Sequence, residues 1–285
     1  MRYRFIESYK KVWPITVMCS VLNVSTSGYY GWVHRRPSRR ALANGVLDGH
    51  IRQVFSQHKQ RYGAPRLADE ISSGGLLCSE NRVARRMRVL GIQAIQRKKF
   101  KVTTDSNHTK SVAGDLLEQD FTATAANQKW VSDMTYVWTD AGWLYLAVVM
   151  DLYSRAIVGW SMKPRMTQQL VADALTMALF RRAFPKGTII DSDRGSQYCA
   201  TRYQQLIERN GLRCSMGRRA TCYDNAAMES FFHTLKVELV HRERYPSRQL
   251  ATARIFEYIE VYYNRQRKHS AIGLQIPMLF EQKSP

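Results

Sequence analysis

The stretch Thr188-Ile-Ile-Asp-Ser-Asp-Arg-Gly-Ser-Gln-Tyr198 decides how the rest of the chain is interpreted. Its apolar start leads into two aspartates and then Arg-Gly-Ser, which is the pattern of a short buried strand that ends in a turn. A carboxylate at the end of a buried strand is costly unless it is paired or binds a cation. Asp193 is therefore the first candidate for a functional site. Asp191 is its nearest rival, because alternate residues of a strand point the same way.

Two other acidic residues lie in segments that can reach Asp193. Asp133 lies within a predicted strand, and Glu229 lies within a predicted helix. Three carboxylates at one point repel one another, and Mg²⁺, which prefers oxygen ligands, resolves that repulsion. Taken singly, each acid is better explained as an ordinary strand, turn or helix-surface residue. Taken together on a basic chain, Asp133, Asp193 and Glu229 favour a catalytic metal site.

The order of the predicted elements indicates the fold class. Strands are expected at residues 130–138, 143–151, 156–162, 188–190 and 212–216. Helices are expected between and after them, at residues 167–184, 203–210, 224–240 and 250–263. This order predicts an α/β fold, a ribonuclease-H-like mixed sheet with helices on both faces. Its first and fourth strands are neighbours, so we expect Asp133 and Asp193 to converge.

Composition points to a polyanionic partner. The 285 residues carry a net charge of +20, and residues 1–114 hold +15 of it. Such an excess favours nucleic acid as the partner over a basic but unrelated enzyme. The five cysteines show no CxxC pairing, which is typical of reduced intracellular thiols. No apolar run approaches the roughly 20 residues of a membrane span, so we expect a cytoplasmic, nucleoid-associated protein.

The N-terminal region has the pattern of a DNA-reading helix-turn-helix. Val17, Met18 and Val21 have helical spacing, Asn23 can break the helix, and Ser25 can cap a second one. A small helical hairpin that binds no DNA would show the same pattern. An Arg-rich linker is expected at residues 34–44, followed by a second group of helices.

One helix of this second group is rich in arginine. Ser79 is expected to cap it and Gly91 to end it, so that it covers residues 80–90. Its arginines can simply be solvated, but the basic run that follows favours phosphate contact. The predicted DNA-binding residues here are Arg82, Arg85, Arg86, Lys98 and Lys99.

These patterns divide the chain into four parts. We expect a helix-turn-helix at residues 1–40, a second basic helical region at 41–101, a connector at 102–126 and the ribonuclease-H-like catalytic core with C-terminal helices at 127–285. The all-α DNA-binding part thus precedes the ribonuclease-H-like part.

Three further residues near the acids have candidate roles. Lys236 lies two helical turns after Glu229 and can reach a DNA phosphate, although a solvated lysine is an equal alternative. Asn225 lies one turn before Glu229 and can hydrogen-bond DNA. Asp151 ends the second predicted strand, and we expect a structural ion pair with Arg155.

Several motifs together resemble one known family. They are Arg61-Tyr-Gly-Ala-Pro-Arg-Leu67, Trp130-Val-Ser-Asp-Met-Thr-Tyr136, Asp151-Leu-Tyr-Ser-Arg-Ala-Ile-Val-Gly-Trp160, Ser192-Asp-Arg-Gly-Ser-Gln-Tyr198, Cys222-Tyr-Asp-Asn-Ala-Ala-Met-Glu-Ser-Phe-Phe232 and Tyr263-Asn-Arg-Gln-Arg-Lys-His-Ser270. With the N-terminal segment from Met18 to Trp32, the chain resembles the orfB-type transposases of bacterial insertion sequences, which have a retroviral-integrase-like DDE core. The likeness covers essentially the whole chain.

The resemblance implies an acidic triad and a metal-dependent chemistry. The triad falls on Asp133, Asp193 and Glu229, and 35 residues separate the last two, which is the gap characteristic of the family. Asp191 stands where relatives often have histidine. The implied cofactor is Mg²⁺, with Mn²⁺ as a substitute and two ions per site, and no zinc module of the integrase HHCC type is present. An activated water would cut a strand, and the 3′-hydroxyl would attack another phosphodiester.

The resemblance also implies the partners. They are double-stranded DNA, namely the terminal inverted repeats of the element and its target, and further copies of the chain on that DNA. Relatives are often made as a frameshift fusion with a small upstream DNA-binding protein that carries a coiled coil. This sequence has no heptad seam for one.

Two other functions compete with the transposase. A hydrolytic nuclease of the same fold would need no separate site-reading module, so the basic helical N-terminal part argues against it. A non-catalytic regulator of transposition would not need Asp133, Asp193 and Glu229. The sequence therefore favours a transposase that binds its element ends, cleaves DNA and transfers strands.

Overall fold

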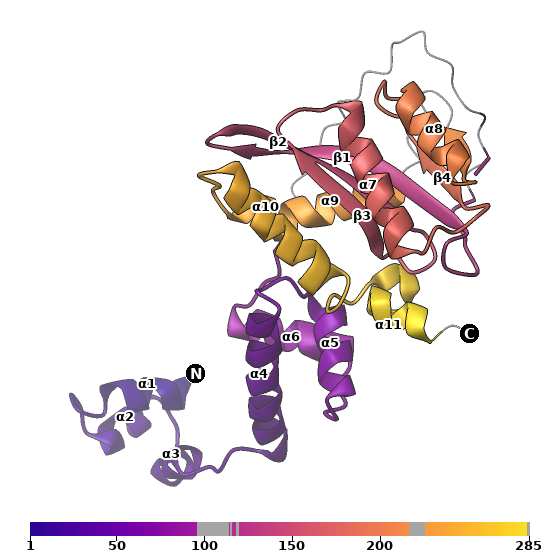
Figure 1. Cartoon of the computed structure of the whole chain (residues 1–285). Helices are drawn as coiled ribbons and strands as arrows, with labels where there is room; N and C mark the ends of the chain where they lie inside the picture. The colour runs from indigo at the N-terminus through magenta and orange to yellow at the C-terminus, as the bar shows by residue number, and fades with distance from the viewer. Residues whose placement is uncertain (96–113, 115, 118–119, 217–225, 284–285) are drawn as a thin grey trace. The chain divides into compact units, whose positions relative to one another are not determined.

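The computed structural model describes residues 1–95, 114, 116–117, 120–216 and 226–283 (Figure 1). The chain divides into two compact units, Met1–Gln93 and Ala94–Pro285. The first unit is built from helices and the second around a sheet, as the sequence predicts. Within the described residues no helix is both long and apolar enough to cross a membrane, and the four cysteines in this part are free thiols.

The second unit contains a mixed sheet of five strands. They are β1 (Lys129–Thr139), β2 (Gly142–Asp151), β3 (Ile157–Lys163), β4 (Ile189–Ser192) and β5 (Arg213–Met216). Their order across the sheet is β3-β2-β1-β4-β5. The first three strands form antiparallel pairs, whereas β4 is parallel to both β1 and β5. The predicted ribonuclease-H-like order is therefore confirmed, with strands one and four as neighbours.

Helices cover both faces of this sheet (Figure 1). On one face α7 (Gln168–Arg181) and α8 (Thr201–Arg209) bury their apolar sides against Ala147, Val149 and Ile190. On the other, α9 (Ala226–Glu238) and α10 (Arg248–Phe256) pack against Val131, Leu146 and Val148. Burial of apolar area on both sides at about 25 cal/mol per Å² holds the sheet between its helices. The predicted helices on both faces are thus confirmed.

Close approach of α7 to the sheet depends on one glycine. A Cβ atom at Gly159 of β3 would lie 2.2 Å from the carbonyl oxygen of Ala174 in α7. Such a separation is far inside van der Waals contact, so only glycine lets the helix lie this close to the strand.

The predicted helix at 250–263 is not one α-helix. After α10 the chain widens into the π-helical segment η2 (Glu257–Tyr263), which buries Tyr258, Ile259, Tyr262 and Tyr263. A π-turn inserts an extra residue per turn and changes which side chains face inward, which apolar periodicity alone does not reveal. Three short helices complete this part of the unit, namely η1 (Val240–Arg242), η3 (Ser270–Ile272) and α11 (Pro277–Gln282).

The first three helices of the N-terminal unit have the predicted helix-turn-helix pattern. They are α1 (Arg2–Tyr9), α2 (Ile15–Val21) and α3 (Thr26–Val33). Asn23 adopts a positive φ of 52° at the break, and the Ser25 side chain caps α3 by accepting from the Gly28 N–H at 3.0 Å. Ile6, Met18, Cys19 and Tyr29 form a small core.

The other helices of this unit are α4 (Arg39–Gln57), α5 (Ala64–Ser73) and α6 (Glu80–Leu90). The bounds of α6 are those predicted, with Ser79 accepting from the Arg82 N–H and Gly91 in the left-handed conformation. The predicted linker at 34–44 is wrong over its second half, where α4 has already begun. Ser38 caps α4 by accepting from the Ala41 N–H at 3.1 Å, and arginine is a good helix former.

Candidate active site beside strand β1

Strand pairing places Asp133 and Asp193 side by side. The parallel register of β1 and β4 ends with Ser132 opposite Ser192, so the two aspartates are the next residues on adjacent strands. Neighbouring strands lie about 4.8 Å apart, and residues in register point to the same face. Asp133 shares its face with Val148 of β2, which belongs to the core under α9.

Each of the two aspartates accepts a hydrogen bond from a nearby backbone N–H. Asp193 follows β4 directly, and one of its carboxylate oxygens accepts from the Gly195 N–H at 2.8 Å. This bond within Asp-Arg-Gly forms the tight turn that the sequence suggested. One Asp133 oxygen accepts from the Met134 N–H at 2.6 Å. Both carboxylates are half-buried, so each keeps an accessible side.

Glu229 reaches the same place from a helix. It lies in the first turn of α9, whose buried side consists of Met228, Phe231, Phe232 and Leu235. These residues belong to the core on one face of the sheet, and α9 contacts β1. The spacing of the apolar residues leaves Glu229 exposed at the start of the helix, above the strand that carries Asp133.

The three carboxylates interact electrostatically. The pKa of Asp133 is raised to about 8. Burial is the largest cause, and the negative charges of Asp193 and Glu229 contribute to the rise. The Met134 N–H and the ammonium of Lys236 act in the opposite direction. Asp133 is thus an acid in a half-buried site whose nearest charged neighbours include two more acids. This is the situation that a divalent cation relieves.

The side chains do not form a ready-made metal cage. Among the described residues no group of three or more His, Cys, Asp and Glu side chains is gathered closely enough to hold a metal ion. The donor set is nevertheless the one that Mg²⁺ takes, since it is typically held by one or two carboxylates together with substrate phosphate. The residues present therefore fit a divalent cation that is completed by a bound phosphodiester.

Lys236 is buried, not solvated. It lies two turns after Glu229 on α9, and its ammonium lies 5.0 Å from the ring centroid of Tyr136 in a cation–π contact. Burial lowers the pKa of Lys236, and the Asp133 carboxylate opposes that shift. The lysine is therefore part of the electrostatic environment of the acids.

Strand β1 extends further than its pairing with β4. Beyond Ser132, β1 continues to Thr139 with β2 as its hydrogen-bonded neighbour, whereas β4 ends at Ser192 within the described sheet. Asp133 is the first residue of β1 after the end of that pairing.

Several predicted residues have other partners or lie elsewhere. Asp191 is buried in β4. Burial raises the pKa of Cys214 and of Tyr203, and the charge of Asp191 adds to both shifts. Asp151 is buried as predicted for a structural residue, but the predicted ion pair with Arg155 is wrong. Its carboxylate accepts instead from the backbone N–H groups of Asn127 (2.8 Å) and Tyr153 (2.9 Å).

The predicted DNA-binding residues stay predictions. Asn225, Lys98 and Lys99 lie outside the described residues. On α6 the Arg86 guanidinium forms a two-pronged ion pair with Asp48 of α4, at 2.6 and 2.7 Å, and Arg82 donates to Asn44 at 3.1 Å. Arg85 is exposed on the same helix.

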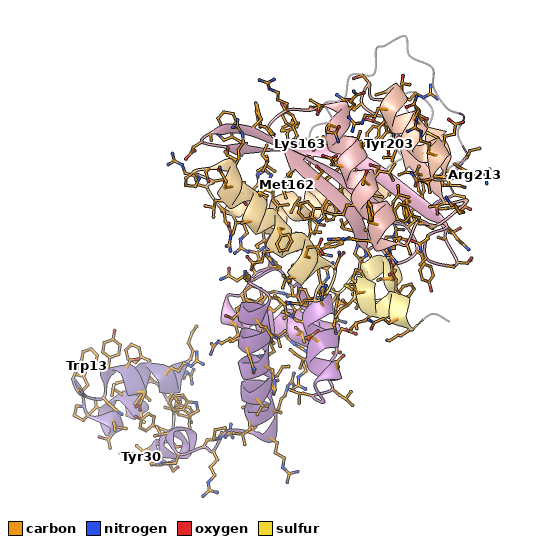
Figure 2. The ribbon with its side chains drawn as sticks, viewed as in Figure 1. Trp13, Tyr30, Met162, Lys163, Tyr203 and Arg213 are labelled. Atoms are coloured by element: carbon orange, nitrogen blue, oxygen red, sulfur yellow. The ribbon has the colours of Figure 1, made fainter. Side chains whose placement is uncertain are left out.

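Two tyrosines near the acids were not assigned roles from the sequence. Tyr198 is buried, and its hydroxyl is 3.2 Å from the Ser132 hydroxyl, directly beside the aspartate pair. Its ring contacts that of Tyr203 on α8, which Figure 2 labels, at 5.4 Å. The other is Tyr136, under Lys236. The only signal for either in the sequence is its place inside a motif that also carries a catalytic candidate.

The chain is similar to known protein families and to known proteins over most of its length. The integrase core domain family matches residues 123–222 and, in a second description, 229–284, and an HTH-like domain matches residues 42–100. The transposase InsF for insertion sequence IS3A of Escherichia coli (strain K12) is 48% identical over 100% of this chain and 99% of its own length. An uncharacterized 31 kDa protein of insertion element IS600 from Shigella sonnei is 46% identical over 93% of this chain and 98% of its own length.

Among solved structures, the chain is similar to a simian T-cell lymphotropic virus intasome in complex with PP2A regulatory subunit B56 gamma. The match has a TM-score of 0.47 and 14% sequence identity, and it covers 82% of this chain and 75% of that one.

Proposed function

The chain belongs to the insertion-sequence transposases with an integrase core, and from this membership we propose that Asp133, Asp193 and Glu229 form its catalytic metal site. As a DDE transposase it cleaves DNA strands at the ends of its element and transfers them to a new site. The observation that carries the assignment is the β1–β4 register, which makes Asp133 and Asp193 the next residues on either side, together with the packing of α9, which bears Glu229, against β1.

The scaffold holds these groups for the reaction. Asp133 stands on β1 of a sheet that is packed on both faces, Asp193 directly follows the adjacent strand β4, and Glu229 stands on a helix fixed by its apolar side. Sites on strands and helices are positioned more precisely than sites on loops. Precision matters here because phosphodiester transfer requires the attacking and leaving oxygens to lie in line.

The carboxylates would hold Mg²⁺, with Mn²⁺ as a substitute and two ions per site. A bound pair of such ions stabilises negative charge on the attacking and leaving oxygens of a phosphodiester. Asp133 has to be ionised to act as a ligand, so proton and metal compete for it. Lys236 favours the ionised form because its ammonium lowers the pKa of Asp133.

DNA binding would come from the basic helical parts and from the edge of the site. The helix-turn-helix α2–α3 is the proposed reader of the element ends, with α6 and the run around Lys98 and Lys99 adding phosphate contacts. Near the acids, Lys236 and Asn225 would contact the strand that is cut. Two ends have to be joined to one target, so the working form is a DNA-bound oligomer in the cytoplasm, at the nucleoid.

A strand-transfer assay tests the proposal. The full chain is incubated with labelled duplexes that carry the inverted repeats of the element and with supercoiled target DNA, in Mg²⁺ or Mn²⁺. We expect 3′-end cleavage and joined products from the wild-type chain. Asp193→Asn should abolish both while binding of the end duplex stays within about two-fold of wild type, because binding relies on other parts of the chain.

The matched control is Glu208→Gln, which removes an exposed carboxylate on α8 of the same unit. It should cut and join at the wild-type rate. Cleavage by Asp193→Asn at the wild-type rate would show the assignment to be wrong. Hydrolysis without joining would favour the nuclease, and shifted but uncut DNA would favour the non-catalytic regulator.

A further inference from the structure

Three large aromatic side chains are exposed on the β1–β2 hairpin. Tyr136 is 40% exposed, Trp138 58% and Trp143 43%. From Thr135 to Thr139 the residues of β1 alternate between buried and exposed, and Tyr136 and Trp138 occupy the exposed positions. In most half-buried strands those positions are polar. These three residues are referred to below as the hairpin aromatic cluster.

The cluster is a continuous surface. The rings of Tyr136 and Trp143 lie 5.1 Å apart and those of Trp138 and Trp143 4.8 Å apart, both in edge-to-face geometry. The cluster lies on the sheet face that α7 covers further along, where Ala147 and Val149 of β2 are buried. Figure 1 shows the turn of the hairpin lying away from α7 and α8.

Hairpin stability explains only part of this arrangement. Trp138 is directly opposite Trp143 across the antiparallel pair, and aromatic cross-strand pairs contribute roughly 0.2–1 kcal/mol. Buried apolar residues on the opposite face, including Val137 and Leu144, already anchor the hairpin to the core. Two exposed tryptophans and a tyrosine are therefore more than the hairpin needs, and large exposed apolar groups mark binding surfaces.

Two cationic side chains contact the residues of the cluster. The Lys236 ammonium lies over the ring of Tyr136 at 5.0 Å. The Nε of Arg248 donates to the backbone carbonyl oxygen of Trp143 at 3.0 Å. Aromatic rings interleaved with Lys and Arg are the combination that binds single-stranded nucleic acid, in which bases stack on the rings and cations contact the backbone.

The cluster is continuous with the candidate active site. Tyr136 is three residues from Asp133 on the same strand, about 10 Å at 3.3 Å per residue, and the two side chains point to opposite faces of the sheet. Lys236 joins the two, because it interacts with the Asp133 carboxylate and with the Tyr136 ring. Both lie on the part of β1 that extends beyond its pairing with β4, so a DNA strand that runs from the carboxylates along this part of β1 would reach the rings.

We propose that Tyr136, Trp138 and Trp143 stack on unpaired bases of the DNA strand whose phosphodiester lies at the carboxylates. This inference rests on the proposed function, since it takes the acids as the place of cleavage. The stacked bases are those nearest the cut, and they have to leave the duplex to reach the rings. Stacking would hold the strand open and keep the scissile phosphate in position.

Binding of a single strand tests the cluster directly. The probes are a 12-nucleotide oligothymidine and an abasic 12-mer with the same phosphates. In Trp138→Val/Trp143→Val, valine keeps the strand propensity and removes the rings. We expect this variant of the full chain to lose affinity for oligothymidine on the order of 10- to 100-fold and to bind the abasic oligomer as wild type does.

Three further variants make the result specific. Trp138→Phe keeps an aromatic face, so this variant should keep most of the wild-type affinity for oligothymidine. Phe180→Ala removes a 68% exposed aromatic ring from α7 in the same unit and should change nothing. Asp193→Asn should bind oligothymidine like the wild type and fail to cut. Thermal unfolding of each variant shows whether it is folded.

Several outcomes would overturn the inference. One is unchanged affinity for oligothymidine in a folded valine variant, and another is an equal loss for the abasic oligomer. A third is loss of self-association in sedimentation with unchanged DNA affinity, which would make the cluster an interface between copies. If Asp193→Asn still cuts, the proposed function fails, whereas the oligothymidine comparison is read without any cleavage.

Discussion

The two ends of helix α9 carry two glutamates in opposite circumstances. Glu238, the last residue of the helix, is buried and accepts from the Arg267 guanidinium at 2.8 Å and from the Tyr258 hydroxyl at 2.8 Å. Glu229, in the first turn, is exposed, and its charge disfavours ionisation of Asp133. One helix thus carries Glu238, which pairs with the cation of Arg267, and Glu229, which interacts with the acid Asp133.

The difference separates a group that stabilises the fold from a group of the proposed site. A buried carboxylate is tolerated when an oppositely charged partner and hydrogen bonds complete its shell, as Arg267 and Tyr258 do for Glu238. A set of like charges destabilises the folded chain unless something else relieves the repulsion, which in the proposed site would be a divalent cation with its phosphodiester. Substitutions at the two ends should therefore have opposite consequences.

The largest expected effect is at the acidic end. Asp133→Asn and Glu229→Gln should each lower the rate of DNA cleavage on the order of 10³-fold or more, because each removes a proposed ligand of the metal. Neither should lower the melting temperature of the metal-free chain, since each also removes a repulsive charge. Single-turnover cleavage and thermal unfolding measure the two quantities. A marked loss of stability in either variant would make that acid a structural residue.

The next effect is at the other end of the helix. Arg267→Met should destabilise the second unit by about 3–5 kcal/mol, because it leaves Glu238 buried without its cation. The double variant Glu238→Gln/Arg267→Met should recover most of this loss. Urea unfolding measures both. If the single variant is as stable as the wild type, the ion pair contributes nothing and the contrast between the two ends disappears.

A pH dependence sharpens the comparison. The pKa of Asp133 is raised in the folded chain to about 8 from an ordinary 3.8, so the folded state binds the proton more tightly than the unfolded state. The free energy of unfolding of the metal-free chain should therefore fall as the pH rises from about 4 to about 8. Asp133→Asn should lack this component. Urea titrations with a chelator at pH 5 and pH 8 measure the free energy of unfolding. The same change in that free energy between the two pH values in wild type and variant would contradict the prediction.

The smallest effects concern the arginines of α6, where a paired and an exposed charge again differ. Arg85→Gln should reduce the slope of log affinity for DNA against log salt by about 1 and leave stability unchanged. Arg86→Gln should lower the stability of the part that contains α4 and α6, because Asp48 loses its two-pronged partner. Unchanged salt slopes in both variants would mean that α6 does not contact DNA.

Much of the fold follows from local pattern. The caps Ser25 and Ser79, the stop at Gly91 and the alternation of strands and helices are readable because each depends on neighbours within a few residues. The start of α4 and the π-helical turn of η2 differ from prediction for the same reason. A capping serine hidden in an Arg-rich segment and an inserted residue in a helix leave no periodic signal.

The candidate site divides along the same line. Asp133, Asp193 and Glu229 can be chosen from the sequence, since strand order and motif spacing point to them. Several partners cannot be chosen in this way, because they are distant in sequence. Asp151 accepts from the backbone N–H of Asn127, 24 residues away. Arg86 pairs with Asp48, 38 residues away, and Lys236 contacts Tyr136, 100 residues away. The cluster of exposed rings on the hairpin is likewise visible only once register and burial are known.

By itself the sequence determines the order of elements, the basic charge of residues 1–114 and which acids are candidates for one site. Those properties depend on interactions along the chain, whose strength is set by near neighbours and by the periods of strand and helix. The tertiary structure alone decides which charges are neutralised and which are left facing one another, as at the two ends of α9. That choice depends on distance and burial, because the energy between charges varies with separation and local dielectric and not with their order in the chain.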